Sequence, residues 1–448
     1  MEGESPCLRA GVAEIDITAQ DLIAGGGIDL TGYVARLGPA IGIHDPLYAR
    51  ALILDDGERR AALLVCDLLA LDASTTADIR AEVSTAISVS EDAIMVACTH
   101  THSGPATMRL NGCGDVNPAY LRYLYPRLVA AARHAAAALR PVSVAAGVGE
   151  LAGAAYDRRS AGTAIDTRLS IIALRTSDGS LLALLTNYGC HPVVMNADNR
   201  LVSADYPGAF AANLHRLTGG LAFCLTGADG DVDPVERGSF GAVEALGMHL
   251  SQEALRVLGS LEWQNGCRIK TRRGRVDAPL NAPPDVETLR AFLESHRNHQ
   301  TQADSAAQPI EARIERAMED WSEQTLAAML SGSLRPTLPI EIQAVAIGPG
   351  TLVGISGELF TTLGAAIKDS VPGQVVLTAS YANGDVGYIP DREAYLRGGY
   401  EVDSAYKYYG HPAALASGTG EQVASTAASL VRELSAELTT ERRCMAQP

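Results

Sequence analysis

The alternation of strand-like and helix-like runs along the 448 residues is the feature that most constrains the fold. Apolar runs of strand length occur at 49–54, 60–66, 93–98, 142–148, 169–176, 181–188, 222–225, 340–347, 352–355 and 375–379. Segments with apolar residues at helical spacing lie between them at 75–88, 120–139, 207–217, 241–258 and 420–438. Such alternation predicts an α/β fold, with a mixed β-sheet core flanked by helices.

One stretch departs from this rhythm. Residues 283–331 are polar and helix-favouring, and they contain no strand candidate. Pro283-Pro284-Asp285 is suited to begin one helix, and 310–331 is suited to form a second. We therefore expect a helical insertion or lid on a single catalytic domain that spans 1–448.

Charge and patterning exclude several classes of partner. The formal net charge is −16, and the only short basic run, 270–275, has the alternation of the solvent face of a strand. Nucleic acid is therefore not an expected partner, because binding to it needs clustered basic residues. The N-terminus has no basic and apolar leader, and no stretch approaches the roughly 18 apolar residues of a membrane span. These features predict a cytoplasmic protein that acts on a small-molecule substrate, and a homo-oligomer is compatible with the sequence.

The eight cysteines support the same compartment. They stand at positions 7, 66, 98, 113, 190, 224, 267 and 444, without any CxxC spacing. Several lie in apolar strand-like runs, so we expect small buried side chains in a reducing environment, not disulfides or thiolate ligands.

A pair of histidines directly follows one of the apolar runs. His100 and His102 stand in the segment Thr99-His100-Thr101-His102-Ser103-Gly104. On a continuing strand, residues at i and i+2 face the same side. In a loop at the strand end, the two histidines either bind one metal together or have separate roles in the site. Neutral imidazole is the commonest metal ligand, so the pair indicates a metal or catalytic site more than two structural histidines.

Further polar side chains follow other predicted strands. His191 comes after 181–188, Glu358 after 352–355, and Tyr388 after a glycine-rich turn. Each has a structural alternative: a histidine fixed before Pro, an acid that favours a helix dipole, and a hairpin residue. The acidic loop 229–233 follows the run 222–225, at the kind of position where α/β enzymes place functional loops. Its three carboxylates lie close together in the sequence, which favours a bound metal, an arginine partner or a cationic substrate group.

These segments and several others occur in a characteristic order. The most specific is Thr99-His100-Thr101-His102-Ser103-Gly104-Pro105. In this order the chain resembles the N-terminal catalytic domain of the neutral, non-lysosomal ceramidase family, and the resemblance covers most of its length. The other matching segments are Thr31-Gly32-Tyr33, Ala49-Arg50-Ala51-Leu52, a strand ending at Asp67, His191, Gly230-Asp231-Val232, Gly357-Glu358 and Asn383-Gly384-Asp385-Val386-Gly387-Tyr388.

The resemblance implies a zinc site and its surroundings. Carried over residue by residue, the zinc ligands are His100, His191, Glu358 and Tyr388. It also implies that four further residues bind the substrate, stabilise an oxyanion or take part in the reaction. These are His102 beside the reacting carbonyl, Arg158 (with Arg159 as the alternative match), Tyr400, and Asp233 at the position of the family's reactive residue.

Two departures from the family pattern bear on the substrate. The residue after Gly230-Asp231-Val232 is a reactive serine in ceramidases, whereas here it is Asp233. We also expect no counterpart of the family's C-terminal immunoglobulin-like domain. We expect a soluble relative with a smaller and more polar substrate than ceramide, in which Asp233 is a general base or a substrate anchor.

The resulting hypothesis is a zinc-dependent hydrolase that cleaves an amide-type carbon–nitrogen bond through a metal-bound water. Two alternatives remain open. The same site is compatible with zinc-dependent acyl transfer, cyclisation or elimination in specialised metabolism. A non-catalytic relative that binds a metal and a ligand, having lost turnover with the serine, is the other.

Overall fold

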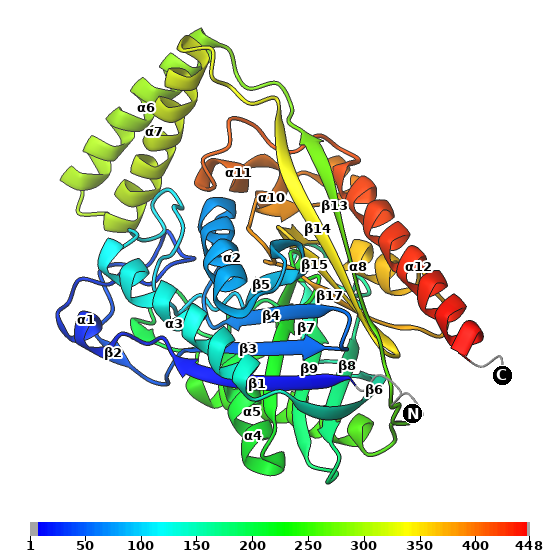
Figure 1. The fold of residues 1–448 in the computed structure, drawn as a ribbon. Coiled ribbons are helices and arrows are strands. Elements are labelled where there is room, and N and C mark those ends of the chain that lie inside the picture. Colours follow the sequence, from blue (N-terminus) through cyan, green and yellow to red (C-terminus); the bar gives the residue numbers. More distant parts are fainter. Residues whose placement is uncertain (1–7, 446–448) are drawn as a thin grey trace.

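Two mixed β-sheets lie face to face in the computed structural model, which describes residues 8–445 and the side chains up to 440 (Figure 1). The larger sheet has the order β11 (Leu221–Thr226), β9 (Leu181–Tyr188), β8 (Arg168–Thr176), β6 (Arg140–Glu150), β1 (Arg9–Asp16), β3 (Tyr48–Asp55), β4 (Arg60–Cys66), β5 (Ile94–Cys98). The smaller sheet has the order β13 (Ile269–Pro279), β14 (Thr337–Ile347), β15 (Gly350–Ile355), β17 (Val375–Ala379). The predicted fold class, a mixed sheet core with flanking helices, is confirmed.

The main core fills the space between the two sheets. β17 lies against β8, β9 and β11 of the larger sheet. Fully buried Ile172 and Leu185 of the larger sheet share one apolar cluster with Leu352 and Leu377 of the smaller sheet. Burial on this scale is the dominant stabilising term in folding, and here it fixes the two sheets relative to each other.

Helices cover the outer faces of both sheets. α3 (Pro118–Ala137) packs on β1 and β3 with α2 (Ala73–Ile87) beside it, while α4 (Asp205–Thr218) and α5 (Phe240–Leu258) pack on β11, β6 and β8. α12 (Thr419–Met445) packs on β13 and β14, and α8 (Thr361–Lys368) on β17. Short elements complete the chain: α1 (Gln20–Ala24), β2 (Gly42–Ile43), the 3₁₀ helix η1 (Glu91–Ala93), β7 (Ala155–Asp157), β10 (Leu201–Val202), β12 (Val232–Pro234), β16 (Glu358–Leu359), β18 (Tyr388–Ile389), α9 (Arg392–Arg397), α10 (Tyr400–Asp403) and α11 (Ala405–Tyr408).

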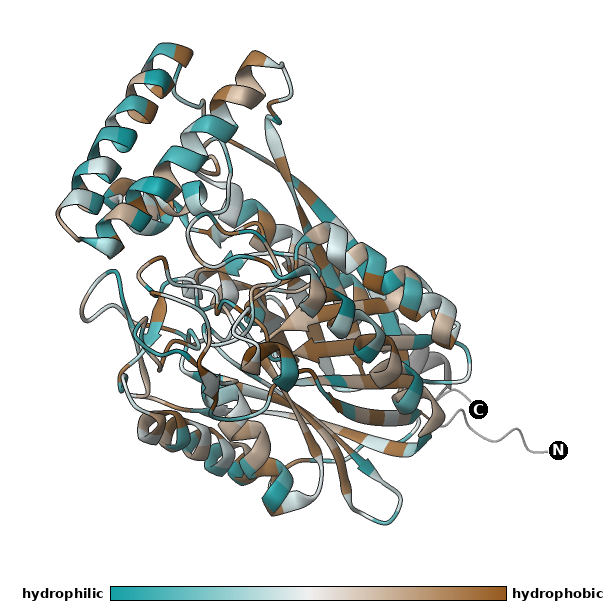
Figure 2. Ribbon diagram, turned by 90° about the vertical axis from the view of Figure 1, so that its left-hand side faces the viewer, coloured by the Kyte–Doolittle hydropathy of each residue, from teal (hydrophilic) through white to brown (hydrophobic). Residues whose placement is uncertain are grey.

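The two helices expected within 283–331 form a protruding antiparallel hairpin, α6 (Val286–Ser305) and α7 (Pro309–Leu330) (Figure 1). Figure 2 shows that hydrophilic colours predominate on the hairpin, while apolar colours gather in the strands. Hydrogen bonds tie α7 to the body: Arg313 donates to the carbonyls of Gly112 (2.8 Å) and Arg36 (2.9 Å), and the Trp321 indole donates to the carbonyl of His411 (2.7 Å).

Within residues 8–445, no helix has both the length and the apolar character that crossing a bilayer requires. The cysteine side chains at positions 66, 98, 113, 190, 224 and 267 are buried, as expected. Cys7 and the side chain of Cys444 lie outside the described residues. The cytoplasmic location stays a prediction.

Candidate metal centre

The site lies where strands from both sheets end. β5 leads into His100, β9 into His191, β15 into Glu358 and β17 into Tyr381. Hydrogen bonds join these strand ends: Thr226 Oγ1 donates to the Thr99 carbonyl (2.6 Å), and the Ser380 amide donates to the Thr226 carbonyl (3.0 Å). The carboxyl ends of strands from both sheets therefore carry the candidate side chains, as α/β folds commonly do.

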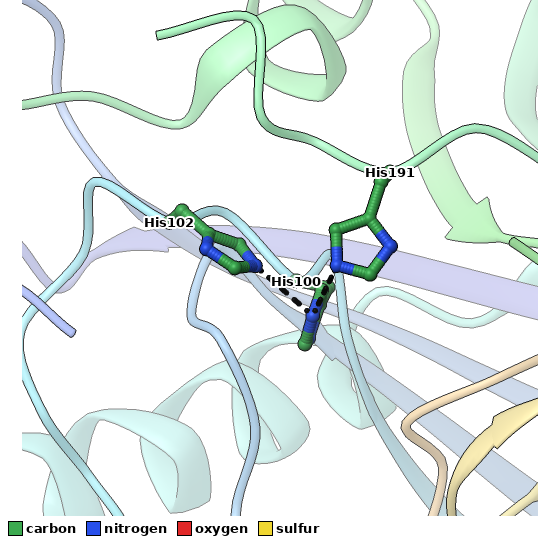
Figure 3. Close-up of side chains that lie close together, drawn as sticks. All are labelled: His100, His102 and His191. Atoms are coloured by element: carbon green, nitrogen blue, oxygen red, sulfur yellow. Dashed lines mark hydrogen bonds between the residues drawn. The ribbon is translucent and has the colours of Figure 1, made fainter. Parts of the chain in front are cut away.

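Three buried imidazoles converge at this point (Figure 3). The Nε2 atom of His100 lies 3.1 Å from Nε2 of His191 and 3.2 Å from Nε2 of His102. Burial is the largest cause that lowers the pKa of His100 and of His102 well below the ordinary value, so both rings are neutral. Neutral imidazoles are the form that coordinates a metal ion.

The outer nitrogens of two rings fix their tautomers. Nδ1 of His100 lies 2.9 Å from the carbonyl of Leu69, and Nδ1 of His191 lies 3.3 Å from the backbone carbonyl of Asp229 and 3.2 Å from its Oδ2. A carbonyl or a carboxylate only accepts a hydrogen bond, so each Nδ1 carries the proton. When both rings are neutral, the two Nε2 atoms, 3.1 Å apart, present lone pairs to each other and do not hydrogen-bond.

A carboxylate and a phenol close the other side of the cluster. Oε2 of Glu358 lies 3.7 Å from Nε2 of both His100 and His191. Glu358 is opposite Tyr388 in the parallel register of β16 and β18, which places the two residues side by side. The Arg158 guanidinium lies over the Tyr388 ring, with Cζ 5.4 Å from the ring centroid.

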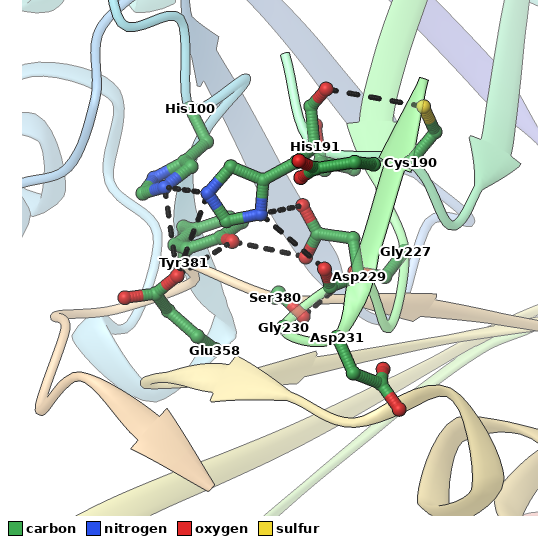
Figure 4. A network of polar contacts seen from close by, with 12 residues as sticks. His100, Cys190, His191, Gly227, Asp229, Gly230, Asp231, Glu358, Ser380 and Tyr381 are labelled. Atoms are coloured by element: carbon green, nitrogen blue, oxygen red, sulfur yellow. Dashed lines mark hydrogen bonds and ion pairs between the residues drawn. The ribbon is translucent and has the colours of Figure 1, made fainter. Parts of the chain in front are cut away.

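A buried hydrogen-bond network supports these groups from behind (Figure 4). The Tyr381 ring stacks on His100, with ring centroids 3.6 Å apart. Its hydroxyl donates to Oδ1 of Asp229 (2.9 Å) and lies 3.3 Å from Oε2 of Glu358. Tyr409 donates to Oε1 of Glu358. Burial alone would lower the pKa of His191, but its contact with Asp229 outweighs burial and raises it.

The backbone has positive φ angles at His100 and at Gly32 beside the histidine cluster. His100 has φ = +67°, a left-handed conformation that few residues other than glycine adopt and that clusters at functional sites. Gly32 makes room for the second histidine: with φ = +98°, it lies so close that a Cβ atom would come 2.3 Å from Nδ1 of His102.

A two-stranded ribbon of β7 and β12 supplies the charged wall of the site. Asp233 pairs with Tyr156 in the antiparallel register, and Arg158 follows two residues later on the same face. Arg158 Nη1 lies 3.3 Å from Oδ1 of Asp233, and Arg237 Nη1 lies 2.7 Å from Oδ2. Arg158 also donates to Glu401 (3.0 Å) and to the Gly230 carbonyl (2.9 Å).

The structure thus gathers the residues that the sequence singled out. Arg158 faces the Tyr388 ring, whereas its alternative Arg159 points away toward Glu401 and the Gly398 carbonyl. Tyr400, 48% exposed, lies with its ring 5.8 Å from that of Tyr388. His102 lies inside the histidine cluster itself. Asp229 belongs to the acidic loop that the sequence indicated, whereas four other neighbours escaped sequence reasoning, namely Tyr381, Tyr409, Arg237 and Glu401.

The donor set fits a zinc ion. Zn–N distances of about 2.0–2.1 Å in a tetrahedral site place two ligand nitrogens about 3.3 Å apart. The observed separation of 3.1 Å between Nε2 of His100 and His191 is close to that value. A cation between these two Nε2 atoms would also remove the repulsion between their facing lone pairs. Imidazole and carboxylate ligands with protonated outer nitrogens held by second partners are usual in protein zinc sites.

Comparisons with known proteins agree on one family. Its sequence model, described as the N-terminal part of neutral/alkaline non-lysosomal ceramidase, matches residues 8–219. The neutral ceramidase of Mycobacterium tuberculosis is 24% identical over 478 residues, covering 89% of this chain and 74% of that protein. The neutral ceramidase of Pseudomonas aeruginosa is 26% identical over 223 residues, covering 45% and 32% respectively.

The fold is shared with solved structures as well. The crystal structure of neutral ceramidase from Pseudomonas aeruginosa superposes with a TM-score of 0.73 at 21% identity, covering 95% of this chain and 74% of that one. A ceramidase structure described as complexed with C2 gives 0.72 at 19% identity, covering 95% and 75%.

Proposed function

The chain belongs to the neutral/alkaline non-lysosomal ceramidase family, and on that basis we propose that it is a zinc-dependent hydrolase of an amide-type carbon–nitrogen bond. The observation that carries the proposal is the convergence of Nε2 of His100 and His191 with Oε2 of Glu358. Three buried ligand atoms with their outer partners in place form a preorganised site that packing alone does not require.

The proposed ligands are His100, His191, Glu358 and Tyr388. A zinc ion held there would supply Lewis acidity toward the substrate carbonyl and acidity to the attacking water. The protein's own contribution is to hold these donors rigidly and to keep the His100 imidazole neutral by burial. Tyr381 and Asp229 perform the first of these tasks through the contacts that they make with Glu358 and His191.

The remaining groups act on the substrate. Arg158 carries five N–H donors, and the contacts with Asp233, Glu401 and Gly230 fix its guanidinium beside Tyr388. We assign it, with His102 and Tyr400, to stabilising the negative charge that develops on the carbonyl oxygen. Such preorganised donors commonly contribute the largest share of catalysis in acyl transfer.

Asp233 has a positioning role in this scheme. Both of its carboxylate oxygens are engaged by guanidinium groups, Oδ1 by Arg158 and Oδ2 by Arg237. Each oxygen already accepts a hydrogen bond from an arginine, so the carboxylate is placed to hold the guanidinium groups in position. We therefore favour an orienting contact with Arg158 over the general-base alternative.

Hydrolysis in ¹⁸O-labelled water tests the reaction class. We expect a purified, zinc-loaded protein to cleave N-acyl amides and to place one ¹⁸O atom in the released carboxylate. Products that retain only ¹⁶O, or a cyclised or transferred acyl product, would point to the alternative reaction at the same site. Asp233→Ser tests the positioning role: we expect turnover to fall at least tenfold, without any gain of ceramide cleavage.

A further inference from the structure

The charged wall of the site contains more cations than it needs for its own structure. Three guanidinium groups, those of Arg158, Arg159 and Arg237, are paired with only two carboxylates, Asp233 and Glu401. The formal charge of this cluster is therefore +1. In a chain of net charge −16, an excess cation beside a catalytic centre is a local feature and not the result of a basic surface.

The excess charge faces solvent at Arg237. Its side chain is 30% exposed, compared with 18% for Arg158 and 10% for Arg159. Arg158 and Arg159 each bind a carboxylate and at least one backbone carbonyl. Among the residues that the structure describes, Asp233 is the only carboxylate that binds Arg237, and it does so through Nη1. Apart from Asp233 and the neighbouring Tyr33 hydroxyl, no described side chain binds this guanidinium, and its remaining N–H groups can meet a ligand.

Arg237 also lies within reach of the reacting centre. Its guanidinium neighbours the Tyr33 hydroxyl, and the Tyr33 ring lies 4.9 Å from the ring of His102, centroid to centroid. From the other side, Asp233 connects it to Arg158, which touches Tyr388. A substrate group a few bonds from the scissile carbonyl would therefore meet Arg237.

The chemistry of this corner favours an anion. Guanidinium groups bind carboxylates through charge-assisted, often bidentate hydrogen bonds. A substrate ammonium is disfavoured, because both oxygens of Asp233 are already bound to arginines. Resting on the proposed amide hydrolysis, we propose that Arg237, oriented by Asp233, binds a carboxylate of the substrate, so that the substrate class is an N-acyl amino acid and not a neutral N-acyl sphingoid base.

Matched substrates test this assignment. N-Hexanoyl derivatives of glycine, alanine and phenylalanine are compared with the corresponding primary carboxamides, which have the same shape without the charge. We expect wild type to prefer the acids by about 10- to 100-fold in kcat/KM, the size of one hydrogen bond to a charged group. In Arg237→Gln the ratio falls to near unity, mainly through a higher KM for the acids. Arg237→Lys keeps part of the preference.

A control variant and a binding readout keep the test decisive. Arg275→Gln removes an arginine that is 64% exposed and paired with Asp277 in β13, and it should leave the ratio unchanged. An unchanged ratio in Arg237→Gln, or a wild-type preference for the carboxamides, overturns the assignment. If no amide is cleaved, the proposed function fails. The assignment of Arg237 is then tested by the thermal stabilisation that uncleavable N-hexylsulfonyl-glycine gives to the protein. Greater stabilisation than by N-hexylsulfonyl-glycinamide, lost in Arg237→Gln, supports the assignment, and equal stabilisation overturns it.

Discussion

Asp229→Asn isolates the contribution of the carboxylate behind the proposed metal ligands. Asp229 is fully buried; Oδ2 lies 3.2 Å from Nδ1 of His191, and Oδ1 accepts the Tyr381 hydroxyl at 2.9 Å. Asparagine has nearly the same shape, but it removes the charge and replaces one acceptor with an NH₂ group. That group would face either the protonated Nδ1 of His191 or the hydroxyl of Tyr381. Loss of an outer partner typically weakens metal binding by about 10- to 100-fold; here the backbone carbonyl of residue 229 stays 3.3 Å from Nδ1, so we expect about 10-fold, or about 1.4 kcal/mol.

A zinc competition titration against a chromophoric chelator measures this change. Asp231→Asn is the matched control, because it lies two residues away and its Oδ1 accepts from the Thr361 amide (2.8 Å) instead of facing His191. We expect Asp231→Asn to bind zinc within about threefold of wild type. The reasoning is refuted if Asp229→Asn binds zinc as tightly as wild type, or if both variants weaken binding equally.

Two further variants test the packing and the protonation of the site's surroundings. Gly32→Ala should abolish most amide hydrolysis, because its Cβ atom would displace His102; Gly26→Ala, also at positive φ (+76°) but with open space around it, should cost only about 1–2 kcal/mol of stability and keep activity. His411 donates to the Val386 carbonyl (2.9 Å), and burial lowers its pKa to about 4. Below pH 6.5 the unfolded chain therefore takes up a proton that the folded state resists. The free energy of unfolding should fall by about 3 kcal/mol as the pH falls from about 6.5 to 4. In urea titrations His411→Gln should lack this part of the pH dependence, and identical pH profiles would contradict it.

Much of the fold could be predicted because local pattern and burial agree in it. The alanine-rich segment at 120–139 corresponds to α3, and the apolar runs at 60–66 and 94–98 correspond to β4 and β5. The central strand β1 was not predicted: its sequence RAGVAEID carries three charged residues, and only two of its eight residues are fully buried. Its place in the sheet is set by pairing with β3 along its whole length, and sequence periodicity does not encode such a partner.

The candidate site was recognisable for a similar reason. His100, His191 and Glu358 each follow a predicted strand, and strand ends meet at one edge in α/β folds. Tyr381 also follows a strand, β17, and Asp229 belongs to the acidic loop, so both carried a usable signal. The roles of Tyr409, Arg237 and Glu401 depend on how short helices and turns pack against the strand ends. No local pattern reports such contacts between distant segments.

Metal content measured together with activity tests the central claim most directly. The protein is purified without added chelator, its metal is quantified by mass spectrometry, and hydrolysis of the N-acyl panel is followed before and after chelation and zinc return. We predict about one zinc ion per chain, loss of hydrolysis when it is removed, recovery when it is restored, and neither zinc nor activity in His100→Ala. Full hydrolysis by the metal-free protein, or an intact wild-type chain that binds no zinc, would contradict the account.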